Sequence, residues 1–250
     1  MSNHWLYCQP LPAAPAEYTL EGPEAHHARV KHLEPGEAVH LFDGRGHVAA
    51  ARVVTLGKLT VSLRIETVAT VAPRTPRLIV AVSRPKGERL DWMLEKLTEL
   101  GVAAIWPLEC ERSVAGARQD RMDRWQRRII EAAKQAHVAW LPTIQPVKNL
   151  PQLLERAAEF TDLLVADTAG PARPILAARL AAGARPLILI GPEGGFSDAE
   201  RERMRRSGFH AVSLGTTVLR TETAAVVAAA CLLTAADLAD WSPATDGSAP

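Results

Sequence analysis

The chain has 250 residues, with 29 Lys and Arg against 28 Asp and Glu, and 47% of its residues are hydrophobic. These values are typical of a folded globular protein and exclude a disordered or fibrous chain. The three cysteines, Cys8, Cys110 and Cys231, are too far apart for a CxxC zinc site and odd in number, which favours a reducing compartment over a disulfide framework.

Residues 1–70 have the pattern of a small β-barrel. Short runs rich in β-branched residues predict strands at 38–42, 47–56 and 59–66. The sequence Asp-Gly-Arg-Gly at 43–46 predicts a hairpin turn between the first two strands, and a helical period occurs only near 23–33. Residues 71–76 contain two prolines and no period, and we interpret them as a linker.

Strand and helix patterns alternate from residue 77 to residue 240. We expect strands at 77–83, 103–108, 162–167, 186–190 and 210–214, and helices at 88–100, 120–139, 197–206 and 222–238. This alternation predicts an α/β domain with a mainly parallel sheet. The tail at 241–250, composed largely of Ser, Pro, Asp and Gly, is expected to be disordered.

The last expected helix is apolar around most of its circumference, which predicts burial on more than one side. Its apolar run, 224–236, is too short to span a membrane. The N-terminus has no basic segment followed by an apolar run, so we expect no signal peptide. Together these features predict a cytoplasmic protein without a membrane partner.

A glycine-rich loop, Gly191-Pro-Glu-Gly-Gly195, follows an apolar strand and precedes a helix. Ser197 and Glu200 have capping-box spacing and mark the start of that helix. In an open α/β sheet, ligands bind beyond the carboxyl ends of strands, and glycine lets the backbone approach a ligand closely. A plain tight turn is the alternative interpretation, and a Gly-Gly pair alone would favour it.

A second loop has the same strand–glycine–helix order at Gly215. Arg220, Thr221, Glu222 and Thr223 crowd the start of an otherwise apolar helix, which we expect Thr221 to cap. Polar side chains at such a junction indicate a candidate active site. Helix capping with one salt bridge is the alternative.

Several common site motifs are missing from both loops. Neither matches GxGxxG or GxxxxGK[ST], which argues against a nicotinamide site and a P-loop. The chain has no GxSxG elbow and no His, Cys, Asp and Glu cluster with metal-ligand spacing, so we expect no metal. Composition and spacing alone predict an α/β domain with a ligand site at two late strand ends.

Two stretches are rich in cations. Residues 74–91 have five cations against two acids, and residues 112–134 have seven against three. A solvated helix face explains such runs as well as a polyanionic partner does.

Four separated sets of residues occur in one order along residues 20–240. They are 26–29 with 41–44, 95–102 with 111–113, Leu-Ile-Gly-Pro-Glu-Gly-Gly-Phe at 189–196, and Leu-Arg-Thr-Glu-Thr-Ala at 219–224. In these residues the chain resembles the family of 16S ribosomal RNA uracil-N3 methyltransferases, within the trefoil-knotted SPOUT superfamily.

The resemblance implies a PUA-like RNA-binding barrel at 1–70 and a SPOUT methyltransferase domain at 77–240. It also implies a deep trefoil knot that holds S-adenosylmethionine, and a homodimer that methylates N3 of a uridine in the small ribosomal subunit. Knots are almost absent from proteins, so no pattern argument predicts one.

The resemblance and the chemistry of adenine recognition together indicate the cofactor site. Adenine needs backbone donors and acceptors in a close apolar slot, and eight residues of the two loops have that chemistry: Ile190, Gly191, Glu193, Gly194, Gly195, Leu214, Gly215 and Leu219.

Arg220 and Glu222 are the candidate catalytic residues. A cation beside O2 or O4 of uracil would stabilise the imide anion that develops as N3 loses its proton, and Arg220 can supply that cation. Arginine cannot act as the base, because its pKa lies above about 12. The base is Glu222, Glu193 or water, and a favourable charge at a helix N-terminus explains Glu222 equally well.

Five cations are candidates for phosphate contacts with RNA: Arg29 and Lys31 in the barrel, and Lys86, Arg89 and Arg112 in the second domain.

The sequence departs from the family pattern in two places. Thr216 and Thr217 follow Gly215 where the family usually has proline or a similar residue and then arginine. After the basic helix the family tends to have Gln-(Ser/Cys)-Gly-Arg, whereas this chain has Gln135-Ala-His-Val-Ala-Trp140, with Ala136 and His137 inside the run, so an arginine expected to contact RNA is missing. Two alternative functions are a SPOUT enzyme for another RNA position, such as a ribose 2′-hydroxyl, and a non-catalytic S-adenosylmethionine-binding ribosome factor.

Overall fold

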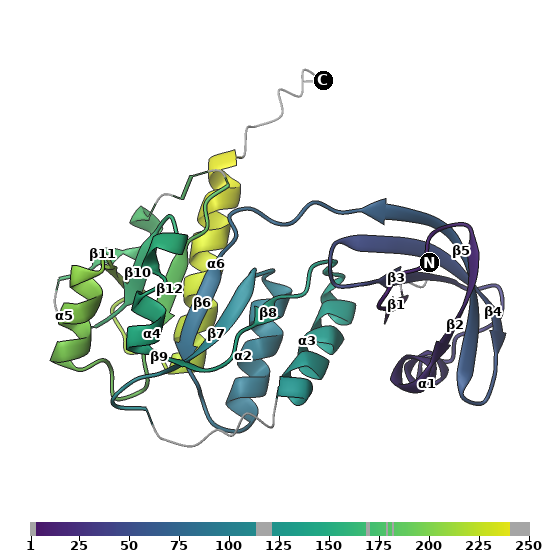
Figure 1. Ribbon diagram of the computed structural model, residues 1–250, viewed down its shortest axis with the longest axis horizontal. Coiled ribbons are helices and arrows are strands. Elements are labelled where there is room, and N and C mark those ends of the chain that lie inside the picture. Colours follow the sequence, from purple (N-terminus) through teal and green to yellow (C-terminus); the bar gives the residue numbers. More distant parts are fainter. Residues whose placement is uncertain (1–3, 114–121, 169–170, 179, 182, 241–250) are drawn as a thin grey trace, which may run out of the picture. The chain divides into compact units, whose positions relative to one another are not determined.

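The computed structural model describes residues 4–113, 122–168, 171–178, 180–181 and 183–240 (Figure 1). The predicted tail at 241–250 and the cations Arg118 and Arg121 of the second basic stretch lie outside these residues. Contacts divide the chain into two compact units. The first is formed by Met1–Arg74, Leu94–Ala103 and Asp120–Thr143, and the second by Thr75–Met93, Ala104–Gln119 and Ile144–Pro250.

The first unit contains the N-terminal strands and one later helix. Its elements are β1 (His4–Tyr7), β2 (Ala16–Glu21), α1 (Gly22–Val30), β3 (Ala38–Phe42), β4 (His47–Leu56), β5 (Thr60–Thr70) and α3 (Met122–Ala136). Helix α2 (Glu88–Glu99) is divided between the units.

The five strands of the first unit form one sheet in the order β1-β3-β4-β5-β2. Register shifts between β4 and β5 mark irregularities of the kind that bend a strand pair. The predicted hairpin turn is present: Asp43 Oδ1 accepts hydrogen bonds from the backbone N–H of Arg45 (2.7 Å) and of His47 (3.1 Å). Burial raises the pKa of Asp43, but hydrogen bonds from the His47 side chain and from these two amides outweigh burial and hold the pKa below its usual value.

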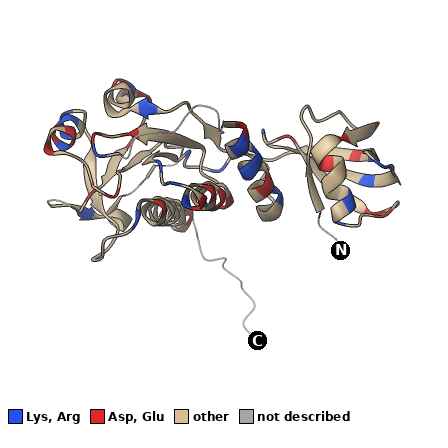
Figure 2. Ribbon diagram, turned by 90° about the horizontal axis from the view of Figure 1, so that it is seen from below, with Lys and Arg blue, Asp and Glu red and all other residues tan. Residues whose placement is uncertain are grey.

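Helix α3 packs in the first unit although the sequence places it far from the barrel strands. Trp125, Ile129 and Ala133 form its buried stripe. Lys134 is only 5% exposed and pairs through Nζ with Glu24 Oε1 of α1 at 3.0 Å and with Glu131 Oε1 at 2.6 Å. Lys and Arg colour much of α3 in Figure 2, but Lys134 is enclosed by carboxylates, so this member of the basic stretch is not available to a polyanion.

The loop after α3 explains one departure from the family pattern. His137 has a φ of +56°, in the left-handed region that glycine adopts without strain. Its ring stacks on Trp5 of β1, with ring centroids 5.3 Å apart. The histidine therefore occupies a position suited to glycine and gains an aromatic contact there.

The second unit is an α/β domain. Its elements are β6 (Ile79–Ser83), β7 (Ala104–Glu109), β9 (Lys148–Asn149), α4 (Leu150–Leu154), η2 (Ala157–Glu159), β10 (Leu163–Ala166), β11 (Arg173–Pro174), η3 (Ile175–Ala177), β12 (Leu187–Ile190), α5 (Asp198–Arg206), β13 (His210–Ser213) and α6 (Thr221–Asp240).

The sheet has the order β11-β13-β10-β12-β6-β7, with the short β8 (Thr143–Ile144) beyond β7 and β9 also paired to β7. The pairs from β11 to β7 are all parallel, which confirms the predicted parallel sheet. Residues of β6, β7 and β12 pack in one core with residues of α4 and α5. Helix α6 contacts β6 and β12. Every residue of β6 is buried, as expected for a strand covered on both faces.

Helix α6 is longer than the sequence pattern predicts. It runs from Thr221 to Asp240, and its stretch Thr221–Ala239 is long and apolar enough to cross a membrane by length and composition alone, with a mean hydropathy of 1.6. The expectation that this segment is too short was therefore wrong. Core helices of folded domains have the same composition, and the contacts of α6 with β6, β12 and η3 account for its buried apolar residues.

Candidate functional site

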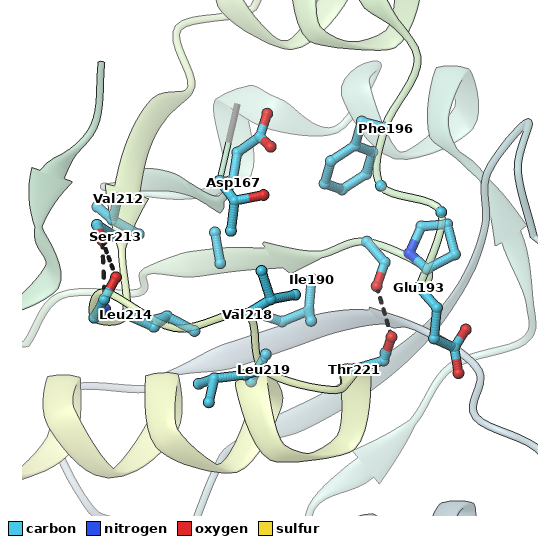
Figure 3. A pocket seen from close by; sticks show the side chains of 18 of the residues that line it. Asp167, Ile190, Glu193, Phe196, Val212, Ser213, Leu214, Val218, Leu219 and Thr221 are labelled. Atoms are coloured by element: carbon cyan, nitrogen blue, oxygen red, sulfur yellow. Dashed lines mark hydrogen bonds between the residues drawn. The ribbon is translucent and has the colours of Figure 1, made fainter. Parts of the chain in front are cut away.

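A pocket opens at the carboxyl ends of β10, β12 and β13, which are neighbours in the sheet (Figure 3). All eight predicted cofactor residues line it: Ile190, Gly191, Glu193, Gly194, Gly195, Leu214, Gly215 and Leu219. The two glycine loops therefore meet at one site, as the sequence predicts.

The glycines of the first loop are required for two different reasons. A Cβ on Gly191 would lie 2.9 Å from Cε2 of Phe196, so the ring of Phe196 fills the space that a side chain would need. Gly195 has a φ of +67° and its N–H donates to the Pro192 carbonyl at 2.8 Å, which closes a tight turn. The backbone conformation of this turn therefore requires a glycine at position 195, which also lines the pocket.

A hydrogen bond between the loops fixes the start of α6. The prediction that Thr221 caps α6 is wrong, because the helix begins at Thr221 itself. The Thr221 hydroxyl instead donates to the Gly191 carbonyl at 3.1 Å. Gly215 is held in turn by Ser213, whose Oγ donates to the Gly215 carbonyl (3.0 Å) and accepts from its N–H (3.3 Å).

Glu200 ties the first loop to the loop that follows β7. Its carboxylate is buried, and Oε2 accepts from the Ser197 N–H at 2.8 Å, which completes the predicted capping box of α5. Its Oε1 accepts from the Glu111 N–H at 2.9 Å. Next to Glu111, the Arg112 guanidinium donates to the Gly194 carbonyl at 3.0 Å. Two contacts therefore hold the strand-end loops together beside the pocket.

Arg220 and Glu222, the predicted catalytic residues, flank the pocket rather than line it. Arg220 is exposed and lies between the lining residues Leu219 and Thr221. Glu222 is buried, and its Oε1 lies 4.0 Å from Nε of Arg89. Its Oε2 has no hydrogen-bond donor among the residues that the structure describes.

The predicted RNA-binding cations occur in both units. Lys86, Arg89 and Arg112 are exposed in the second unit. The Arg89 guanidinium lies 3.8 Å from the Glu193 carboxylate, so Arg89 and Arg112 both contact the glycine loop.

Arg29 and Lys31 are exposed on the first unit, where Arg29 donates to the Lys58 carbonyl at 2.6 Å.

The pocket also contains two charged side chains that the sequence analysis did not select. Asp167 follows β10, and Arg201 lies on α5. Arg201 Nε donates to Asp167 Oδ2 at 2.7 Å. The end of the predicted strand 162–167 was the available signal for Asp167, but only the sheet order places that strand between the two glycine loops. Within the described residues, no group of His, Cys, Asp and Glu could hold a metal ion.

Comparison with known proteins gives two domain matches. Residues 72–233 match the family described as RNA methyltransferase domain, and residues 20–66 match the RNA methyltransferase PUA domain.

Relatives match over nearly the whole chain. The ribosomal RNA small subunit methyltransferase E of Mycobacterium bovis is 35% identical over 89% of this chain and 88% of its own, and that of Bacillus subtilis is 31% identical over 88% and 90%. A crystal structure of the Neisseria gonorrhoeae methyltransferase E, bound to S-adenosyl methionine, is 30% identical, covers 94% of this chain and 98% of its own, and has a TM-score of 0.86. The chain thus belongs to the ribosomal RNA small subunit methyltransferase E family, with a PUA-like N-terminal domain and a parallel-sheet methyltransferase domain.

Proposed function

We propose that the protein transfers a methyl group from S-adenosylmethionine to N3 of a uridine in 16S rRNA of the small ribosomal subunit. One observation carries this proposal: the eight predicted cofactor residues converge on one pocket at the strand ends. The similar Neisseria gonorrhoeae methyltransferase E was crystallised with S-adenosyl methionine bound.

The residues that line the pocket fit this cofactor. Ile190, Leu214, Val218 and Leu219 supply apolar surface for an adenine ring, and the backbone of Gly191 and its neighbours borders the same space (Figure 3). Aromatic and apolar contacts with a few placed polar groups are typical of small-molecule sites. The deep trefoil knot of the SPOUT superfamily is part of this proposal, with loops 191–195 and 214–220 as its ligand-binding segments.

S-Adenosylmethionine supplies an electrophilic methyl carbon attached to a sulfonium, and a new bond to uracil N3 forms as the carbon–sulfur bond breaks. The task of this chain is to orient the reactants and stabilise the charge that develops. Arg220 is exposed at the junction between the pocket and α6, where its guanidinium can donate to O2 or O4 of the uracil as negative charge develops.

The N3 proton must move to a base, and two carboxylates are near the pocket. Glu222 is buried in the first turn of α6 beside Arg89, and Glu193 lines the pocket and is more exposed. The pH dependence of the single-turnover rate, measured for Glu222→Gln and for Glu193→Gln, identifies the base. The variant that lacks the base should lose the pH dependence of the wild type, and if neither variant loses it, the base is water.

The remaining parts of the proposal concern RNA, domains and assembly. RNA phosphates would contact Arg29 and Lys31 on a barrel formed by residues 1–70, and Lys86, Arg89 and Arg112 on a methyltransferase domain at 77–240, with 71–76 as the linker. We place the protein in the cytoplasm, where ribosomes are assembled.

A homodimer is supported by the second apolar side of α6. Cys231, Thr234 and Leu238 of α6 line an apolar groove with Leu176 and Leu180. Leu238 is 65% exposed in the single chain. A second copy of the chain covering this groove would bury it.

Nucleoside mass spectrometry of 16S rRNA from cells that lack the protein tests the proposal. We expect 3-methyluridine to disappear and to return when the wild-type protein is restored. Loss of a 2′-O-methylated nucleoside instead would indicate another RNA position, and an unchanged set of modified nucleosides would indicate a binding factor without this activity.

A further inference from the structure

The pocket has an apolar side and a charged side. Ile190, Val218 and Leu219 lie on one side, and Asp167 and Phe196 lie across from them (Figure 3). Asp167 and Arg201 are the charged residues of that second side, and the predicted cofactor set includes neither. A ligand that fills this pocket must therefore present a flat apolar part to one side and a hydrogen-bonding part to the other.

The Asp167 carboxylate is held rigidly at the pocket wall. Its backbone N–H donates to the Val212 carbonyl of β13 at 3.3 Å, and the side chain is 9% exposed. Arg201 Nε donates to Oδ2 at 2.7 Å, and another guanidinium nitrogen approaches Oδ1 at 3.5 Å. Arg201 also donates to Asp198 Oδ1 at 3.0 Å, but Asp198 is 99% exposed, so this solvent-screened pair contributes little to the position of Arg201.

A fixed carboxylate is suited to a ligand with two neighbouring donors. An ionised carboxylate has two oxygens with about four lone-pair positions, so it can accept several hydrogen bonds at once, and Asp167 presents such a group at the wall of the pocket. A vicinal diol can donate two O–H groups to such a carboxylate, as acidic side chains do for ribose in dinucleotide sites.

We propose that Asp167 accepts hydrogen bonds from the ribose hydroxyls of the adenosine cofactor, and that Arg201 positions Asp167 for this contact. The inference rests on the proposed use of S-adenosylmethionine and adds the residue that recognises its sugar. Adenine occupies the apolar side of the pocket, and the ribose faces the charged side.

The test is calorimetric binding of three ligands to the wild type and to Asp167→Asn. The ligands are S-adenosylhomocysteine, 5′-methylthioadenosine, which lacks the amino acid part, and the 2′,3′-dideoxy form of 5′-methylthioadenosine. We expect Asp167→Asn to weaken the first two ligands equally, by about 10- to 100-fold, the usual effect of losing hydrogen bonds to a charged group. The dideoxy ligand should bind the wild type and the variant with the same affinity, because it lacks the hydroxyls.

Two further variants separate binding from structure. Asp198→Asn removes an exposed partner of Arg201 and should bind all three ligands like the wild type. Arg201→Met keeps the Asp167 carboxylate but removes the guanidinium that positions it. This variant should weaken the binding of the first two ligands by a smaller factor than Asp167→Asn does. Circular dichroism confirms that each variant is folded.

Three results would overturn the inference. Asp167→Asn could bind 5′-methylthioadenosine with the affinity of the wild type. It could also weaken the binding of S-adenosylhomocysteine alone, which would mean that Asp167 contacts the amino group of that ligand's amino acid part. The wild type could bind the dideoxy ligand as tightly as the ribose ligand, a measurement that needs no folded variant. Failure of the wild type to bind any adenosine ligand would instead contradict the proposed function itself.

Discussion

Replacing the buried carboxylate of Glu200 should loosen two strand-end loops at once. Glu200 is 2% exposed, and its two oxygens accept from the backbone N–H groups of Glu111 and Ser197. Glu200→Gln keeps one acceptor oxygen and turns an amide NH₂ toward the other backbone donor. The loss of one hydrogen bond to a charged group lowers the free energy of unfolding by about 1.5–3 kcal/mol. Glu200→Ala leaves both N–H groups without a partner and should cost about twice as much.

Urea denaturation and hydrogen exchange measure this effect. In Glu200→Gln the unfolding midpoint should fall, and the amides of Glu111 and Ser197 should exchange faster than in the wild type. Affinity for S-adenosylmethionine should fall as well, because one of the two contacts that hold the loop 191–195 and the start of α5 to the loop after β7 is weakened. Glu202→Gln is the matched control on α5, since its partners Arg205 and Arg206 are exposed, and it should leave midpoint and affinity unchanged. Wild-type exchange at both amides in Glu200→Gln would refute this reasoning.

Three other perturbations follow from the structure. Gly191→Ala places a Cβ against Phe196 and should cost about 1–3 kcal/mol of stability along with cofactor affinity; unchanged calorimetric binding and melting would contradict this. Burial and the nearby Lys134 lower the pKa of His27, so the unfolded state binds its proton more readily, and stability should decrease as the pH falls below about 6.5. In His27→Gln the free energy of unfolding, measured by denaturation between pH 5 and pH 7, should depend less on pH than in the wild type. An unchanged pH dependence would mean that other groups cause it. Leu238→Glu should convert a dimer to a monomer in sedimentation at micromolar concentration, whereas a monomeric wild type would rule out the proposed dimer.

The sequence predicts elements well where one pattern dominates. The strands 38–42 and 47–56 coincide with β3 and β4, and Ser197 caps α5 as its spacing with Glu200 indicates. Period, β-branched residues and capping chemistry are local properties, so they can be read without knowing the rest of the chain.

Elements stabilised by distant partners could not be predicted in the same way. Strands β1 and β2 are short and of mixed polarity, and β1 exists through parallel pairing with β3 more than thirty residues later. Lys134 reads as a solvated cation, but its partner Glu24 lies 110 residues away in the sequence. Such pairings depend on tertiary contacts that override local pattern.

The candidate site shows the same division. Glycine loops after apolar strands indicate the pocket, and the structure brings both together. Asp167 was missed because its position between the loops follows from β10 lying between β12 and β13, a sheet order that chain order does not reveal. Thr221 was misassigned because its hydroxyl bonds across to Gly191 rather than to its own helix.

The most direct test of the account is single-turnover methyl transfer to small ribosomal subunits from cells that lack the protein, with the product identified by nucleoside mass spectrometry. The wild type should form 3-methyluridine. Arg220→Ala should form it about 10²–10³-fold more slowly, the usual cost of one such donor, and Arg220→Lys should recover part of that loss because it keeps the charge without the planar fork. Cofactor affinity should change little in either variant. A methyl group at any other atom, or an Arg220→Ala protein with a normal rate at saturating cofactor, would contradict the account.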